Sequence, residues 1–113
     1  MRWVLRSKIH HASVTEADLD YVGSLTVDHD LILKAGFWPG EKVSVVNVTN
    51  GHRIETYLFS GEAGSGVICA NGAAAHKITK GDKIIIIGYE LTDKPIAAQA
   101  ILVDEKNKFI RML

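Results

Sequence analysis

Runs of apolar and β-branched residues recur along the chain about every ten positions, separated by polar or turn-forming residues. Short runs rich in Val, Ile, Thr and aromatic residues at this spacing are typical of small all-β domains. We therefore predict a small closed β architecture, with strands over residues 3–10, 24–28, 42–48, 53–59, 67–70, 83–89, 97–103 and 108–112.

Turn residues mark the reversals between these strands, at residues 39–40, 50–51, 81–82 and 104–107. Asn50-Gly51 is the strongest hairpin signal among them, because both residues tolerate positive φ. Only two short helices are expected. One covers residues 28–35, with Asp28 as its N-cap and Gly36 as its end, and the other covers the alanine-rich residues 71–76.

Length and composition indicate one globular domain. The chain has 113 residues, 47% hydrophobic and 23% charged, which leaves enough apolar surface for one core. Lys and Arg number 13, as do Asp and Glu, so no basic surplus favours nucleic acid. The longest aliphatic run, residues 84–87, is far shorter than the ~20 residues of a membrane span. We expect a cytoplasmic protein that binds neither nucleic acid nor membranes.

The residues that carry familiar enzyme chemistry are mostly missing. The five histidines are scattered and the one cysteine, Cys69, lies in a predicted buried strand, so no metal site is expected. His10 and His11 are neighbours on a predicted strand and should face opposite sides. Enzymes that enclose pyridoxal phosphate normally use a far larger scaffold, so a chain this short needs another electrophile.

The backbone itself can supply an electrophile. Where serine follows glycine in a strained turn, its hydroxyl can attack the glycine carbonyl and turn the amide into an ester. Elimination then leaves dehydroalanine, which exchanges ammonia for water and becomes an N-terminal pyruvoyl group, an electron sink. The dipeptide occurs twice, as Gly23-Ser24 and Gly64-Ser65, and by itself it is more often an ordinary turn.

Three spaced blocks distinguish the first dipeptide from the second. Residues 8–28, which read KIHHASVTEADLDYVGSLTVD, closely resemble the processing region of the bacterial, pyruvoyl-dependent aspartate 1-decarboxylases. Residues 47–53 (NVTNGHR) with Thr56-Tyr57, and residues 71–76 (NGAAAH), resemble that family's substrate and oxyanion segments in the same order. The resemblance covers essentially the whole chain.

The resemblance implies a mainly β fold, namely a six-stranded double-psi β-barrel with short connecting helices. It implies a homotetramer with active sites between subunits, and self-cleavage before Ser24 into a β chain, residues 1–23, and an α chain, residues 24–113, that begins with pyruvoyl. It also implies decarboxylation of L-aspartate to β-alanine for pantothenate biosynthesis, without a metal or pyridoxal phosphate. Whether cleavage needs a maturation partner stays open.

The resemblance also assigns roles at the cleavage site. Gly23 and Ser24 are the residues that are cut, Tyr21 orients their turn, and Thr56 polarises the Gly23 carbonyl. After cleavage, the pyruvoyl group from Ser24 forms a Schiff base with the substrate, and Tyr57 donates a proton. Thr56 and Tyr57 are adjacent on one strand, so they face opposite sides unless a bulge intervenes.

Binding of a dianionic substrate calls for cations and N–H donors. Arg53 can hold a carboxylate with two hydrogen bonds. Lys8 would add a second positive charge, although it could equally be a solvated strand lysine, and His10 could contribute a polar or proton-relay group. The start of the second helix would bind negative charge through Asn71, Gly72, Ala73 and Ala74.

Two other functions are compatible with a small β-barrel. A binding module could recognise an acidic metabolite through Arg53 and Lys8 without cutting itself. A nucleic-acid-binding barrel or a swapped-hairpin regulator is the other alternative, and the zero net charge argues against it.

Overall fold

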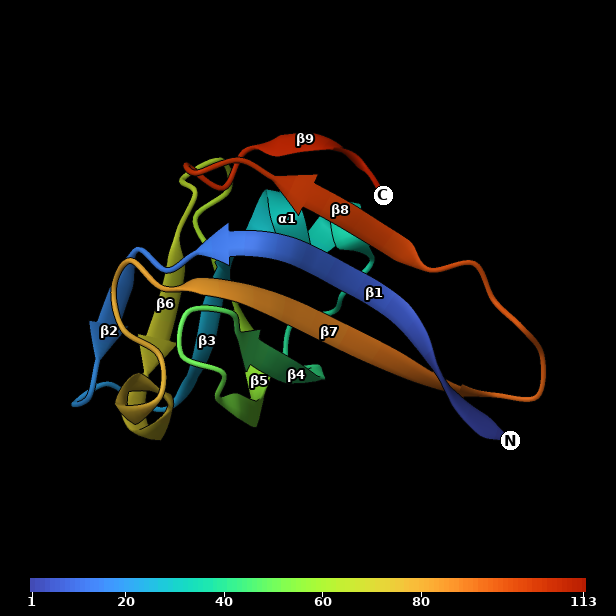
Figure 1. Ribbon diagram of the computed structural model, residues 1–113, viewed down its shortest axis with the longest axis horizontal. Coiled ribbons are helices and arrows are strands. Elements are labelled where there is room, and N and C mark those ends of the chain that lie inside the picture. The colour runs from blue at the N-terminus through green and yellow to red at the C-terminus, as the bar shows by residue number, and fades with distance from the viewer.

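The computed structural model describes residues 1–113, and the chain is mainly β, as predicted (Figure 1). Strands make up most of the regular structure, with one α-helix and one 3-10 helix between them. The elements are β1 (Arg2–Ser13), β2 (Glu16–Asp18), β3 (Ser24–Asp28), α1 (His29–Ala35), β4 (Lys42–Asn47), β5 (Arg53–Gly61), β6 (Ile68–Asn71), η1 (Gly72–His76), β7 (Lys83–Thr92), β8 (Gln99–Val103) and β9 (Phe109–Met112).

Every predicted strand is present, and β3 has the predicted bounds. Asn50-Gly51 lies between β4 and β5, which form the antiparallel pair that this hairpin signal indicated. Strand β2 was not predicted, because all three of its residues are exposed and two are acidic. The sheet has nine strands, with β2 and β9 as short strands at its two edges, whereas the resemblance implies six in the barrel itself.

Both predicted helices form. Helix α1 begins after Asp28, whose side chain accepts a hydrogen bond from the Asp30 N–H at 2.9 Å, and ends at Gly36 with φ 75°. This confirms the N-cap and the left-handed end. The second helix, η1, is a five-residue 3-10 helix, and the side chain of its N-cap, Asn71, makes no capping bond. Neither helix has the length and apolar character needed to cross a bilayer.

The strands form one curled sheet in the order β2-β6-β3-β5-β4-β7-β1-β8-β9. Strands β1 and β2 follow each other in the chain but lie in different parts of the sheet: β1 pairs with β7 and β8, whereas β2 pairs with β6 at the far edge (Figure 1). In the short link between β1 and β2, the Thr15 N–H donates to the Ile68 carbonyl at 2.8 Å. The sheet therefore curls back toward its own beginning, which is consistent with a small β-barrel.

A core of 19 buried apolar residues lies inside this curl. The strands bury alternate residues, as expected for a sheet with one face on the core. In β7, for example, Ile84 and Ile86 are fully buried while Ile85 between them is only partly buried. Helix α1 covers the core with Leu31, Ile32 and Ala35.

Two buried polar side chains hold the loops that surround β3. Asp28, at the end of β3, accepts hydrogen bonds from the main-chain N–H groups of Gly64 and Gly66 at 2.9 and 2.8 Å. Asn107 accepts from the Ser13 N–H at 2.7 Å and donates to the carbonyls of Ser13 and Gly66 at 2.8 Å. Because these buried groups have their partners, they hold the C-terminal end of β3 in place.

Candidate active site

Ser24 is the first residue of β3, and its surroundings differ from those of an ordinary strand serine. It is 3% exposed and has φ 129°, which residues with a side chain rarely adopt. Such a conformation costs on the order of 1–3 kcal/mol and persists only where the surrounding structure enforces it. The Ser24 Oγ is buried without a hydrogen-bond partner. The residue after the Gly23 carbonyl therefore has a strained backbone and a hydroxyl without a hydrogen-bond partner.

The second Gly-Ser dipeptide lacks these features. Ser65 is exposed, and its Oγ donates to the Glu62 carbonyl at 2.6 Å and accepts from the Val67 N–H at 3.2 Å. Its φ is not positive. Gly64-Ser65 is therefore an ordinary turn, as its sequence context suggested.

The main chain of Gly72 lies against the turn that precedes Ser24. A Cβ placed on Gly72 would be 2.9 Å from Gly23 Cα and 3.1 Å from the Tyr21 carbonyl oxygen, and Gly72 has φ 61°. Only glycine satisfies both the contact and the left-handed backbone without strain. The start of η1 and the Gly23 turn are thus in backbone contact, while Tyr21 is 58% exposed.

Strand β6 pairs antiparallel with β3, and Asn71 lies directly opposite Ser24. Asn71 is buried, and its Nδ2 donates to the Thr26 Oγ1 at 2.9 Å. The next two predicted residues, Ala73 and Ala74, follow in η1, the first exposed and the second half-buried. The predicted oxyanion segment therefore begins beside Ser24.

Strand β5 lies on the other side of β3 and runs parallel to it. The first pair is Leu25 with Leu58, so the preceding residues Gly23-Ser24 are level with Thr56-Tyr57 when the register is continued. Strand β5 pairs with β4 without a register shift, so no bulge turns the side chains of Thr56 and Tyr57 to the same face. Thr56 is half-buried and Tyr57 is 41% exposed, and they lie on opposite faces of β5.

The predicted substrate-binding cations lie on strands other than β3, which carries Ser24. Lys8 and His10 lie in β1, which is three strands from β5 in the sheet order, or about 14 Å along the sheet. Arg53 begins β5, four residues before Tyr57, which is about 13 Å along the strand. The side chain of Arg53 is exposed and Lys8 is half-buried.

The expectation that His10 and His11 face opposite sides is wrong. The β1–β7 register is irregular between Ile9 and Ala12, and His11 has φ 62°. This bulge breaks the alternation, and the two rings stack with centroids 4.0 Å apart. His10 Nδ1 is buried without a partner. Burial, followed by the charges of His11 and Lys8, lowers the pKa of His10, so its imidazole is mainly neutral at pH 7.

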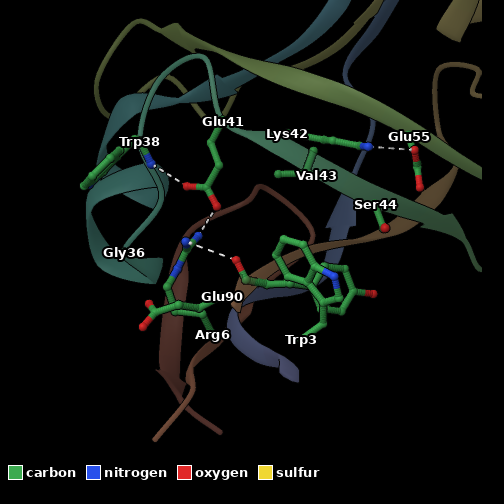
Figure 2. Close-up of a pocket in the computed structure, with 11 residues that line it drawn as sticks. Trp3, Arg6, Gly36, Trp38, Glu41, Lys42, Val43, Ser44, Glu55 and Glu90 are labelled. Atoms are coloured by element: carbon green, nitrogen blue, oxygen red, sulfur yellow. Dashed lines mark hydrogen bonds and ion pairs between the residues drawn. The ribbon is translucent and has the colours of Figure 1, made fainter. Parts of the chain in front are cut away.

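A cavity of about 880 Å³ lies elsewhere, between β1, β4 and β7 (Figure 2). Arg6 pairs with Glu41 in it, and Glu41 also accepts from the Trp38 N–H at 3.0 Å. Lys42 and Glu55 form a second ion pair at 3.2 Å. None of the predicted site residues lines this cavity. No three His, Cys, Asp or Glu side chains come together as metal ligands anywhere in the chain.

Two polar residues next to Ser24 were not predicted as part of the site. Thr26 lies two positions after Ser24, and Cys69 lies two positions before Asn71. Cys69 is 6% exposed, as expected of a small buried residue, but its Sγ lies 3.1 Å from the Asn71 Oδ1. Strand alternation was the signal that could have found both, since residues two apart share a face.

Together, the fold and these contacts define a small β-barrel that holds a buried, strained Gly-Ser turn against an Asn-Gly segment. The family model described as aspartate decarboxylase matches residues 1–110. The chain therefore belongs to the aspartate decarboxylase family.

Curated relatives agree with this family. A protein named aspartate 1-decarboxylase from Neisseria meningitidis serogroup C is 56% identical, over 95% of this chain and 87% of its own length. One of the same name from Corynebacterium efficiens is 53% identical, over 99% of this chain and 85% of its own. Another, from Caldicellulosiruptor bescii, is 52% identical, over 96% and 88%.

Proposed function

We propose that this chain is an aspartate 1-decarboxylase that cuts itself between Gly23 and Ser24 and converts L-aspartate to β-alanine and carbon dioxide. The β-alanine would serve the biosynthesis of pantothenate and coenzyme A. Membership of the aspartate decarboxylase family supports the reaction. The observation that carries the self-cleavage is Ser24 itself, with φ 129° and a buried Oγ that has no partner.

In the proposed cleavage, the Ser24 Oγ bonds to the Gly23 carbonyl carbon while the peptide C–N bond breaks, and a proton passes to the freed amine. The position of Thr56 level with Gly23 supports a role in donating a hydrogen bond to that carbonyl oxygen. Loss of the Ser24 Cα proton then breaks the Cβ–O bond and releases Gly23 as a carboxylate. Water finally replaces ammonia, which leaves pyruvoyl at the start of residues 24–113 and residues 1–23 as a separate β chain.

The surroundings of Ser24 fit a pyruvoyl group, because the site already encloses a small polar side chain opposite the Asn71 main chain. When present, a ketone next to an amide carbonyl supplies an electron sink for the electron pair that stays on the substrate when carbon dioxide departs. Tyr57, which is level with Ser24, would donate the proton that replaces carbon dioxide. The proposed reaction requires neither a metal ion nor pyridoxal phosphate.

Substrate binding supports a further proposal, a homotetramer with active sites between subunits. Lys8 lies on β1 and Arg53 begins β5, so neither is on the strand that carries Ser24, and in the proposed tetramer a neighbouring subunit brings cations to the site. Trp3 and Trp38 are 71% and 78% exposed, and exposed aromatic residues are typical of protein contacts. Light scattering on the purified protein should give the mass of four chains, and the mass of one chain would contradict the proposal.

Whether cleavage needs a maturation partner is tested by adding a cell extract to the purified chain: a partner should accelerate the splitting. A cytoplasmic location is proposed from composition, and cell fractionation tests it.

Intact-mass spectrometry tests the self-cleavage. Cleavage predicts two fragments whose summed mass is about 1 Da above that of the uncut chain, because elimination conserves mass and water then replaces ammonia. Ser24→Ala should abolish both splitting and β-alanine formation, whereas Ser65→Ala should leave both intact. An active protein that carries an unmodified Ser24 in an uncut chain would refute the mechanism.

A further inference from the structure

Strands β2, β6 and β3 lie side by side, and β3 begins with Ser24 at the cleavage turn (Figure 1). In the antiparallel pair of β3 and β6, Ser24 is opposite Asn71 and Thr26 is opposite Cys69. Residues that are directly opposite share a face of the sheet, and so do residues two positions apart. The side chains of Thr26, Cys69 and Asn71 therefore belong to one face, and Ser24 is paired with Asn71 at its end.

Hydrogen bonds connect three of these side chains. The Cys69 Sγ lies 3.1 Å from the Asn71 Oδ1, and the Asn71 Nδ2 donates to the Thr26 Oγ1 at 2.9 Å. Asn71 and Cys69 are 3% and 6% exposed, so water does not readily replace either bond. An amide has a donor end and an acceptor end, and a thiol that donates to Oδ1 determines which end faces which partner. The Asn71 Nδ2 carries two hydrogens, and one of them is left to donate after the bond to Thr26 is made.

The surroundings of Cys69 keep its thiol protonated, which is the form that can donate a hydrogen bond. Burial raises the pKa of the Cys69 thiol, and the carboxylates of Glu16 and Asp18 on the neighbouring strand β2 raise it further. The Glu16 Oε2 is 3.7 Å from Sγ, which is longer than the 3.1 Å to Asn71. The thiol therefore stays protonated at neutral pH, and Asn71 is its nearer acceptor.

We propose that Cys69 is a positioning residue for the reactions at Ser24: its thiol orients the Asn71 amide, so that an Nδ2 hydrogen is available to developing negative charge. This inference rests on the proposed self-cleavage and decarboxylation. Cys69 does not touch the reacting atoms, and it acts through Asn71, whose main chain is paired with Ser24. Cys69 is thus distinct from a reactive cysteine.

The test compares variants that keep or remove the donor. Cys69→Ser keeps a donor, whereas the smaller Cys69→Ala and the larger Cys69→Val both remove it. We measure the rate of splitting of freshly purified chain by intact mass, and kcat and KM for β-alanine formation once splitting is complete. Loss of one hydrogen bond to a catalytic amide should slow splitting and lower kcat about three- to tenfold in the variants without a donor. Cys69→Ser should stay within about twofold of the wild type.

A matched control separates positioning from general stability. The Thr15 Oγ1 bonds to the Ile68 main chain at 3.1 and 3.0 Å, one residue from Cys69, but it does not contact Asn71. Thr15→Val should lower the melting temperature without changing the rate of splitting. In an Asn71→Ala background, removing the thiol should have no further effect on that rate, because the positioned group is already absent.

Each outcome decides the inference. Splitting at the wild-type rate in both Cys69→Ala and Cys69→Val would overturn it, as would equal slowing in Cys69→Ser and Cys69→Val. Additive effects of Cys69→Val and Asn71→Ala would overturn it too. Failure of the wild-type chain to split would instead contradict the proposed function, so the two failures are distinguishable.

Discussion

Replacing Gly72 with alanine tests how the cleavage turn is held. The new Cβ would lie 2.9 Å from Gly23 Cα, 3.1 Å from the Tyr21 carbonyl oxygen and 3.2 Å from the Gly23 nitrogen. Carbon atoms pack at about 3.5–4.0 Å, so the turn would have to move by roughly 0.6 Å or more. All three contacts are to main-chain atoms, and none can be relieved by rotating a side chain.

Two effects add up in this variant. The backbone of Gly72 has φ 61°, where a residue with a Cβ costs roughly 1–2 kcal/mol. Relief of the close contact costs roughly 1–3 kcal/mol more. We expect the free energy of unfolding to fall by about 2–5 kcal/mol and self-cleavage to slow by about 100-fold, because a shift of up to 1 Å between reacting groups has an effect of that size.

The assay follows the uncut chain by intact mass over time, together with thermal unfolding. Gly81→Ala is the matched control, since Gly81 has φ 91° but no atom within 4 Å of the added Cβ. It carries the backbone strain without the contact. If Gly72→Ala splits as fast as Gly81→Ala, contact with Gly72 does not position the Gly23 turn.

Two further predictions concern stability. Asn107→Ala should lower the free energy of unfolding in urea by about 3 kcal/mol, because the buried Asn107 side chain loses three hydrogen bonds to Ser13 and Gly66. A loss under about 1 kcal/mol would show that these bonds are not needed. For His10, burial and the charges of His11 and Lys8 lower the pKa in the folded state. The unfolded chain therefore binds a proton first, so stability is fully present above pH ~6.5 and is lost as pH falls through the lowered pKa. His10→Gln should lose less stability over that interval, and equal pH profiles would contradict this.

The local pattern of the sequence predicted most of the secondary structure correctly. Runs rich in β-branched residues mark the strands because such side chains fit a pleated, half-buried surface. Asp28 and Gly36 mark the ends of α1 because N-caps and left-handed ends have specific residue preferences. Strand β2 escaped prediction because it has no buried residue, and it forms only because β6 offers an unpaired edge.

The candidate site was only partly predictable. The Gly23-Ser24 dipeptide and the Asn71-Gly72 segment were found through resemblance, and the structure places them opposite each other. The stacking of His10 and His11 was missed, because a bulge changes the direction of side chains and short-range pattern does not reveal it.

The amino-acid sequence alone was enough to predict the family, every strand except β2, and which of the two Gly-Ser dipeptides has the matching neighbours. The folded structure was needed to show that this serine has φ 129° and a hydroxyl without a partner, and that Asn71, from a strand far along the chain, lies opposite it. Strain and burial arise from packing between segments far apart in sequence, so neither is encoded in any local run of residues.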